Sequence, residues 1–295
     1  MLKNPQESCS APMFALKRAQ FLCRGDAMAL SAEYRQRFGG VSRLYGEAAL
    51  EVMAQAHMAV IGLGGVGSWV AEALARSGVG ELTLIEMDEV CITNTNRQSQ
   101  ALTSQVGQSK NQVVAERLRD INPEIRLHCI EDFLDSNNLQ NHIGPQHDVV
   151  VDAMDAAITK SALVAYCSVR KIRLVMVGSS GGKADPTRIQ VADLARTEGD
   201  PLLAKVRTQM VHRHGFARDG NRKFRVDAIY SSEQMVYPKP DGSVCMEKQV
   251  MQNGVRLDCA GGFGSSVMVT GAFGFVAAAR AVERYLQRQL GREPA

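Results

Sequence analysis

A glycine-rich turn between an apolar strand and a helix constrains this chain more than any other feature. The turn, Gly62-Leu63-Gly64-Gly65-Val66-Gly67, follows the apolar run 58–61 and opens a helix expected over about 66–77. Glycines at such a turn allow a tight bend, close approach of the backbone to a phosphate, and close packing of helix on strand. The exposed amides at the helix N-terminus favour negative charge. The residues expected to bind a nucleotide here are Gly62, Gly64, Gly65 and Gly67.

Short apolar runs alternate with helical stretches from residue 58 onward. Strands are expected at 58–61, 82–85, 125–130, 149–151 and 174–177, and helices at about 66–77, 108–121, 136–142 and 159–171. This alternation predicts an α/β protein, with a Rossmann-type, mainly parallel sheet and helices on both faces. After residue 182 the pattern changes to a strand at 188–192, a helix at 201–212, a basic loop, short strands and a final helix at 265–289. The change predicts a smaller C-terminal α+β extension.

Composition favours a reduced, globular protein. The 295 residues include seven scattered cysteines and no Cys-x-x-Cys pair, so neither a disulfide framework nor a four-cysteine zinc site is expected. Residues 1–25 lack the apolar core of a secretory signal. The apolar run 267–282 is short for a membrane span and contains two glycines, which favours a buried helix. We therefore expect a cytoplasmic protein without a membrane partner.

The residues after the second strand bear on which nucleotide binds. An acidic residue at that point would bind ribose hydroxyls in an NAD enzyme, and Glu86 and Asp88 are equal candidates. Asn94, Arg97 and Lys110 follow, and would add an amide and two fixed positive charges. A dinucleotide needs no such additions, whereas β- and γ-phosphates and a leaving pyrophosphate do. The combination predicts a triphosphate, ATP.

Five motifs together resemble the ThiF/MoeB/HesA family, the relatives of ubiquitin-activating enzymes. They are the glycine turn, Asp88, the stretches 94–98 and 107–110, and Val151-Asp152-Ala153-Met154-Asp155. The resemblance implies an adenylating enzyme in which Asp88 binds the ATP ribose and Asp155 binds Mg²⁺. It also implies phosphate contacts from Asn94, Arg97 and Lys110. Two departures are the absent zinc-binding Cys-x-x-Cys pairs and Ala156, where members that adenylate protein tails usually have asparagine.

The rest of the chain resembles one branch of that family, the tRNA threonylcarbamoyladenosine dehydratases. The matching stretches are 37–40, 94–98, 185–187, 237–238, 241–245, 258–260 and 262–264. The branch implies a tRNA substrate whose threonylcarbamoyl group is closed into a ring at the expense of ATP. The alternatives are adenylation of the C-terminus of a ubiquitin-like or sulfur-carrier protein, and an NAD-linked oxidoreductase or nucleotide sensor.

These readings divide the chain into three parts: a flexible extension over 1–32, an ATP-binding adenylation core over 33–182, and a C-terminal part over 183–295 that completes the fold. The basic stretch 205–226 in the last part is the candidate tRNA-binding region, where the interleaved His212, His214, Phe216 and Phe224 could stack on unpaired bases.

The remaining expectations concern catalysis and partners. Cys245 is a candidate nucleophile or sulfur acceptor beside the catalytic candidates Arg97, Lys110 and Asp155. Asp258 and Cys259 are equally ambiguous. The family resemblance implies a homodimer in which Arg37 or Arg43 reaches the partner's ATP. A cysteine desulfurase or sulfur-acceptor protein is a further candidate partner.

Overall fold

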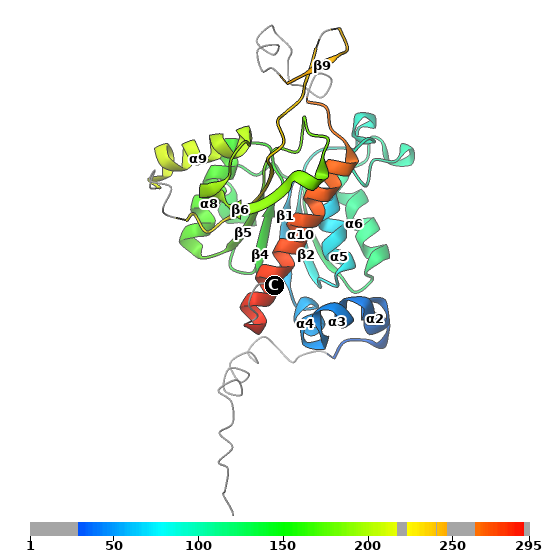
Figure 1. Ribbon diagram of the computed structural model, residues 1–295. Helices are drawn as coiled ribbons and strands as arrows, with labels where there is room; N and C mark the ends of the chain where they lie inside the picture. The colour runs from blue at the N-terminus through cyan, green and yellow to red at the C-terminus, as the bar shows by residue number, and fades with distance from the viewer. Residues whose placement is uncertain (1–28, 217–222, 240, 247–262, 292–295) are drawn as a thin grey trace, which may run out of the picture.

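A computed structural model describes residues 29–216, 223–239, 241–246 and 263–291 (Figure 1). Most of the expected extension, and Asp258 and Cys259, lie outside the described residues. The helices are α2 (Ala32–Arg37), α3 (Gly39–Tyr45), α4 (Glu47–Met53), α5 (Gly67–Arg76), α6 (Lys110–Ile121), α7 (Leu139–His142), α8 (Ala157–Arg170), α9 (Pro201–His214) and α10 (Val267–Leu290). The strands are β1 (His57–Ile61), β2 (Glu81–Ile85), β3 (Arg126–Ile130), β4 (Val149–Asp152), β5 (Arg173–Val177), β6 (Ile189–Asp193), β7 (Asp227–Ser231), β8 (Tyr237–Pro238) and β9 (Val244–Cys245).

Seven strands form one sheet in the order β3-β2-β1-β4-β5-β7-β6. All neighbouring pairs are parallel except β6 with β7, so the predicted mainly parallel sheet is confirmed. The chain starts in the middle at β1, runs outward through β2 to β3, and then returns to place β4 on the other side of β1. Such a reversal of strand order opens a crevice at the carboxyl ends of the two central strands, where α/β proteins bind their ligands.

Helices cover both faces of the sheet, as expected. Apolar side chains of α5, α6 and α10 pack with Val60, Leu84 and Val151 in one buried cluster. Those of α8 and α9 pack with Ile61 and Val150 in a second cluster on the other face. Successive strand residues thus alternate between two buried layers, which explains why the central strands read as unbroken apolar runs in the sequence.

The C-terminal part shares the main sheet. It supplies β6 and β7 to one edge, while α10 lies across the sheet against α5 and contacts α4, β4, β5 and β7 (Figure 1). In the described part of the chain, β8 and β9 form a second, two-stranded sheet. Within the described residues, no helix is long and apolar enough to cross a membrane, α10 included.

The three short helices α2–α4 were not predicted. They lie at the end of the molecule opposite β9 (Figure 1), directly before the amino end of β1. Tyr34 and Phe38 pack edge to face against each other and, with Leu50, form a small buried cluster. Helices of six or seven residues carry too few apolar positions to show a helical period, which is why the sequence did not reveal them.

Candidate active site

The glycine turn and the segment carrying Asp155 leave the sheet from adjacent strands. The turn follows β1 and the segment 153–155 follows β4, and β1 and β4 pair directly. The backbone amide of Gly62 donates to Ile85 O (2.9 Å), and that of Ala153 donates to Ile61 O (2.9 Å). Both segments therefore border the crevice at the point where the strand order reverses, which makes this the candidate nucleotide site.

The four predicted glycines differ in what requires them. Gly62 has φ +83°, a conformation that side chains disfavour. A Cβ on Gly67 would lie 1.7 Å from Gly62 O, because the first turn of α5 packs directly on the end of β1. At Gly64 the nearest neighbour of an added Cβ would be Gln98 Nε2, 4.0 Å away. Gly62 and Gly67 are therefore needed by the fold, whereas Gly64 has room that a ligand could occupy.

Hydrogen bonding separates the two acidic candidates, Glu86 and Asp88. Glu86 is buried, and its Oε2 accepts from the amide of Leu63 in the glycine turn (2.8 Å). Its Oε1 accepts from the amides of Met87 and Asp88 (3.0 Å each). Glu86 thus holds the turn against the end of β2. The Asp88 side chain is 53% exposed, so Asp88 is the acid that can receive a ligand.

Lys110 lies against Asp88. Its Nζ donates to Asp88 Oδ2 at 2.8 Å, and its backbone amide donates to Asp88 O (3.0 Å). The Ser109 side chain caps α6 by accepting from the amide of Gln112, which fixes Lys110 as the first residue of the helix. The Lys110 side chain is only 7% exposed. The structure therefore brings together a cation and a carboxylate 22 residues apart.

Arg97 lies directly over the glycine turn. A Cβ on Gly65 would lie 3.0 Å from Arg97 Cγ. The guanidinium donates to Thr93 O (2.9 Å) and Asn96 Oδ1 (3.0 Å), and Arg97 O accepts from Trp69 Nε1 of α5 (2.9 Å). The loop 93–98 is thus anchored on α5 with its cation beside the turn.

The Asn94 side chain stabilises the backbone of this loop. Its Oδ1 accepts from the amide of Cys91 (3.0 Å) and closes a short 3₁₀ helix over Ile92–Asn94, and the residue is buried. Its role as a phosphate ligand stays a prediction.

Asp155 is exposed just before the N-terminus of α8, two residues after Ala153. The Ala153 carbonyl oxygen would lie 3.2 Å from a Cβ on Gly62, so the segment touches the glycine turn. Upstream, Asp152 is fully buried and pairs with Lys160 of α8 (3.0 Å). Burial raises the pKa of Asp152, while Lys160 opposes that shift. Sequence reasoning missed this pair, although a lysine on the apolar side of a predicted helix was the available signal.

Two cysteines lie on described segments of interest. Cys245, the predicted one, is half-buried in β9 opposite Tyr237, and its catalytic role stays a prediction. Cys91 was not singled out, yet it is exposed at the start of the loop that carries Arg97. A hydrogen bond from Thr93 to the Cys91 sulfur lowers the pKa of this thiol.

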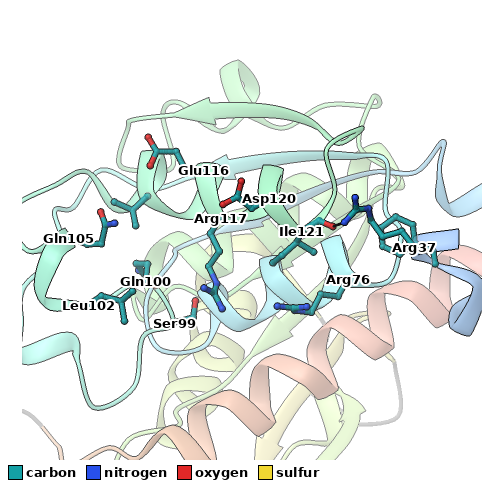
Figure 2. A pocket seen from close by; sticks show the side chains of 12 residues that line it. Arg37, Arg76, Ser99, Gln100, Leu102, Gln105, Glu116, Arg117, Asp120 and Ile121 are labelled. Atoms are coloured by element: carbon teal, nitrogen blue, oxygen red, sulfur yellow. Dashed lines mark hydrogen bonds between the residues drawn. The ribbon is translucent and has the colours of Figure 1, made fainter. Parts of the chain in front are cut away.

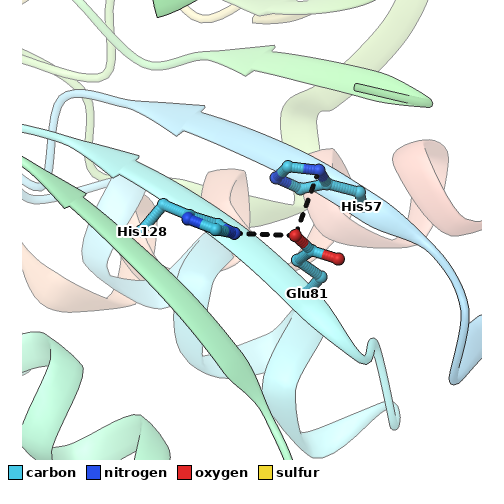
Figure 3. A group of neighbouring side chains, drawn as sticks. All are labelled: His57, Glu81 and His128. Atoms are coloured by element: carbon cyan, nitrogen blue, oxygen red, sulfur yellow. Dashed lines mark hydrogen bonds and ion pairs between the residues drawn. The ribbon is translucent and has the colours of Figure 1, made fainter. Parts of the chain in front are cut away.

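Two other features contain charged or polar side chains outside the predicted nucleotide-binding set. A cavity of about 540 Å³ is lined by residues of α2, α5, α6 and the segment 99–105 (Figure 2). Its lining includes Arg37, one of the two arginines expected to reach a partner's ATP, and Gln100, which donates to Leu63 O of the glycine turn (2.8 Å). His57, Glu81 and His128 gather at the amino ends of β1 and β2 (Figure 3). Glu81 already accepts from His128 (2.7 Å) and Arg126 (2.6 Å), so we describe it as a hydrogen-bonded cluster.

Comparison with known proteins agrees with this geometry. The ThiF family profile matches residues 37–290. The tRNA threonylcarbamoyladenosine dehydratase of Escherichia coli K12 is 48% identical over 262 residues, covering 89% of this chain and 98% of its own. That of Haemophilus influenzae is 44% identical with the same coverage. A crystal structure of the E. coli dehydratase, TcdA, in complex with ATP superposes with a TM-score of 0.79 at 45% identity, covering 89% of this chain and 99% of that one.

The chain belongs to the ThiF family, as the motifs indicated. Within that family, its similarity runs nearly end to end with the tRNA threonylcarbamoyladenosine dehydratases. The predicted branch is therefore confirmed.

Proposed function

We propose that this chain is an ATP-dependent enzyme that dehydrates, and thereby cyclises, the threonylcarbamoyl group of a modified adenosine in tRNA. One observation carries the ATP part: Glu86 is occupied by three backbone amides, which leaves the exposed Asp88 as the acid for the ribose, with Lys110 paired to it and Arg97 beside the glycine turn. The dehydration part rests on relatives of that name that match 98% of their own length.

Each predicted site residue has a place in this proposal. The turn and the N-terminus of α5 receive the phosphates, and Asp88 receives the ribose hydroxyls. Arg97 and Lys110 neutralise charge on the departing pyrophosphate. The contact between Lys110 and Asp88 supports this assignment, because one ion pair then positions both the ribose ligand and the phosphate cation. Asn94 adds its amide to the phosphates.

Asp155 is the residue that would hold Mg²⁺. The residue fits the ion, because it is an exposed carboxylate whose segment touches the glycine turn, and Mg²⁺ prefers carboxylate and phosphate oxygens. The ion would supply charge neutralisation on the phosphates.

The chemistry balances without a further reactant. An oxygen of the threonyl carboxylate attacks the α-phosphorus of ATP, the bond to the β-phosphate breaks, and pyrophosphate leaves. The neighbouring carbamoyl group then attacks the activated acyl carbon, and AMP leaves with the carboxylate oxygen while the attacking group loses its proton. The substrate has lost one water overall. Because both reacting groups belong to one side chain, the second step is favoured by proximity, and a thioester on Cys245 or Cys91 is not required.

The decisive experiment incubates the protein with ATP, Mg²⁺ and threonylcarbamoylated tRNA, and measures the nucleoside mass. The expected result is loss of one water together with release of AMP and pyrophosphate. Loss of water without ATP, or none with it, would contradict the proposal. Pyrophosphate exchange stimulated instead by a Gly-Gly-tailed protein would favour the sulfur-carrier alternative. A separate reaction that adds a cysteine desulfurase and free cysteine as the sulfur donor tests persulfide transfer to Cys91 or Cys245.

We further propose a homodimer in which Arg43 completes the partner's ATP site. The helices α2 and α3 precede the amino end of β1, whereas the glycine turn follows its carboxyl end, so neither arginine is near its own turn. Arg37 is paired with Glu33 (2.6 Å). Arg43 has no such pair among the described residues, and Leu44 beside it is 74% exposed. An Arg43→Ala protein mixed with an Arg97→Ala protein should regain activity, and failure of the mixture would exclude Arg43 as the arginine that acts across the interface.

A further inference from the structure

A cavity lined by cationic side chains lies at the amino ends of the parallel strands, whereas the glycine turn lies at their carboxyl ends. It has a volume of about 400 Å³ and is bordered by the amino ends of β5 and β7, the end of the antiparallel β6, and α10. Five cationic side chains line it: Arg173, Lys223, Arg225, Arg280 and Arg284. Only two carboxylates, Asp193 and Asp227, share the lining, so the cavity carries a formal excess of three positive charges.

Both carboxylates are already engaged. Asp227 lies between Arg280 (3.0 Å) and Arg284 (2.7 Å). Asp193 accepts from the backbone amides of Phe224 (2.9 Å) and Arg225 (2.8 Å), which fixes the strand entry with Arg225 at φ +59°. Neither acid is therefore available to the other cations of the cavity.

Arg173 is the half-buried cation of this lining that forms no ion pair among the described residues. No hydrogen bond to it is seen in the described parts of the chain either. Burial lowers its pKa, and the neighbouring charges of Arg288 and Arg284 lower it further, while the charge of Asp227 opposes the shift. Arg280 Nε is also buried without a partner. Crowding like charges in a partly dry hollow costs free energy that a bound anion would offset.

We infer that this cavity binds a phosphate group of the RNA backbone. Guanidinium groups present forked donors that match phosphate oxygens, and the cavity gathers several of them around one hollow. The inference rests on the proposed tRNA substrate, because RNA supplies such phosphates in series. Strands of five residues span about 17 Å, so one tRNA is long enough to contact both the amino and the carboxyl ends of the strands.

The cavity also revises the basic stretch predicted at 205–226. Lys223 and Arg225 belong to the cavity, while Arg207 of α9 hydrogen-bonds to Thr197. Phe224 is buried and packs edge to face on Phe216, so the predicted stacking of Phe224 on a base is wrong. The members Arg218 and Arg222 lie outside the described residues. Arg173, Arg280 and Arg284 could not be found from a local charge run, because they come from distant segments.

The test compares Arg173→Gln with Arg119→Gln, an exposed arginine on α6 whose loss removes the same charge. The affinity of each for an unmodified tRNA transcript is measured over a range of salt concentrations. We expect Arg173→Gln to weaken binding about tenfold and to reduce the slope of log K against log salt by about 0.7–0.9. Arg119→Gln should leave both unchanged, and Lys223→Gln should behave like Arg173→Gln if it folds as the wild type does.

Inorganic phosphate distinguishes the two sources of the anion. If it raises the melting temperature of the wild type but not of Arg173→Gln, while tRNA affinity is equal for both, the cavity takes a small anion and the inference is overturned. Equal tRNA affinity with no phosphate effect also overturns it. If Arg173→Gln binds tRNA more weakly than the wild type, and the wild type does not cyclise the nucleoside, the cavity is supported and the proposed function is rejected, so the two failures are distinct.

Discussion

At the scale of single residues, hydrogen bonding assigns roles that residue type does not. Glu86 and Asp88 are both acids at the end of β2, and the sequence could not show which of them binds the ribose hydroxyls. The fold separates them by directing three amides, including one from the glycine turn, at Glu86. Those amides come together only when β1 and β2 are paired, so no local pattern could have shown it. Contacts in the fold also separate the glycines: Gly62 and Gly67 are needed by the fold, whereas Gly64 has room for a ligand.

Replacing Gly67 and Gly64 by alanine should separate fold from ligand binding. The Cβ of Gly67→Ala would lie 1.7 Å from a backbone oxygen, so we expect a loss of about 3 kcal/mol in the free energy of unfolding. Gly64→Ala meets no atom closer than 4.0 Å and should unfold like the wild type while binding ATP more weakly. Urea unfolding and ATP titration measure the two quantities. A stable Gly67→Ala protein would show that the first turn of α5 can move.

Arg97→Ala should lower turnover about 10²–10³-fold, since a fixed cation beside the leaving group stabilises developing charge.

Asp88→Ala should instead weaken ATP binding by about 1.5–3 kcal/mol, because it removes hydrogen bonds to a charged group. Single-turnover pyrophosphate release and ATP titration separate these effects. Near-normal release by Arg97→Ala would remove Arg97 from the site.

At the scale of elements, the buried Asp152–Lys160 pair ties α8 to β4. Lys160 Nζ also donates to Val177 O of β5 (2.8 Å), so one side chain connects a helix to two adjacent strands. The sequence predicted these three elements correctly from apolar periodicity. Periodicity could not predict the connection, because it describes one element at a time, and it missed α2–α4 altogether.

Lys160→Met should lower the free energy of unfolding by about 3–5 kcal/mol, because it leaves the Asp152 charge buried without its partner. The double variant Lys160→Met with Asp152→Asn should recover part of that loss, since no charge is then buried. Chemical denaturation of both proteins is the measurement. A double variant no more stable than the single one would mean that the hydrogen bonds of Lys160, rather than the charge, dominate.

At the scale of the whole molecule, the sequence predicted the mainly parallel sheet, and the structure brings several of the predicted site residues together at the glycine turn. The strands, the crevice and the cations around the glycine turn followed from pattern and resemblance. The cavity around Arg173 and the histidine cluster did not, because both arise where distant strands become neighbours. The imidazole rings of His57 in β1 and His147 before β4 both hydrogen-bond to the hydroxyl of Thr83 in β2 (2.8 and 3.1 Å). This hydroxyl therefore connects three segments that are distant in the sequence.

The neighbouring rings of His57 and His147 predict a loss of stability in mild acid. Burial, and then the charge of His57, lower the pKa of His147 to about 4, and burial also lowers that of His57. A histidine with a lowered folded pKa stays neutral while the unfolded chain protonates, so stability falls as pH drops from 6.5 toward 4. For His147 the loss approaches about 3 kcal/mol. His147→Gln should flatten the pH dependence of urea unfolding in this window, and an unchanged slope would contradict the assignment.

The carboxylate of Glu86 has a last consequence for how the nucleotide is received. Because it already restrains the amides of Leu63, Met87 and Asp88, the two loops that would hold phosphate and ribose are ordered before any ligand arrives. ATP binding should then cost little backbone conformational entropy. We expect the two loops to have the same backbone conformation with and without ATP. In hydrogen exchange, these three amides should be slow without ATP, and Glu86→Gln should speed them together.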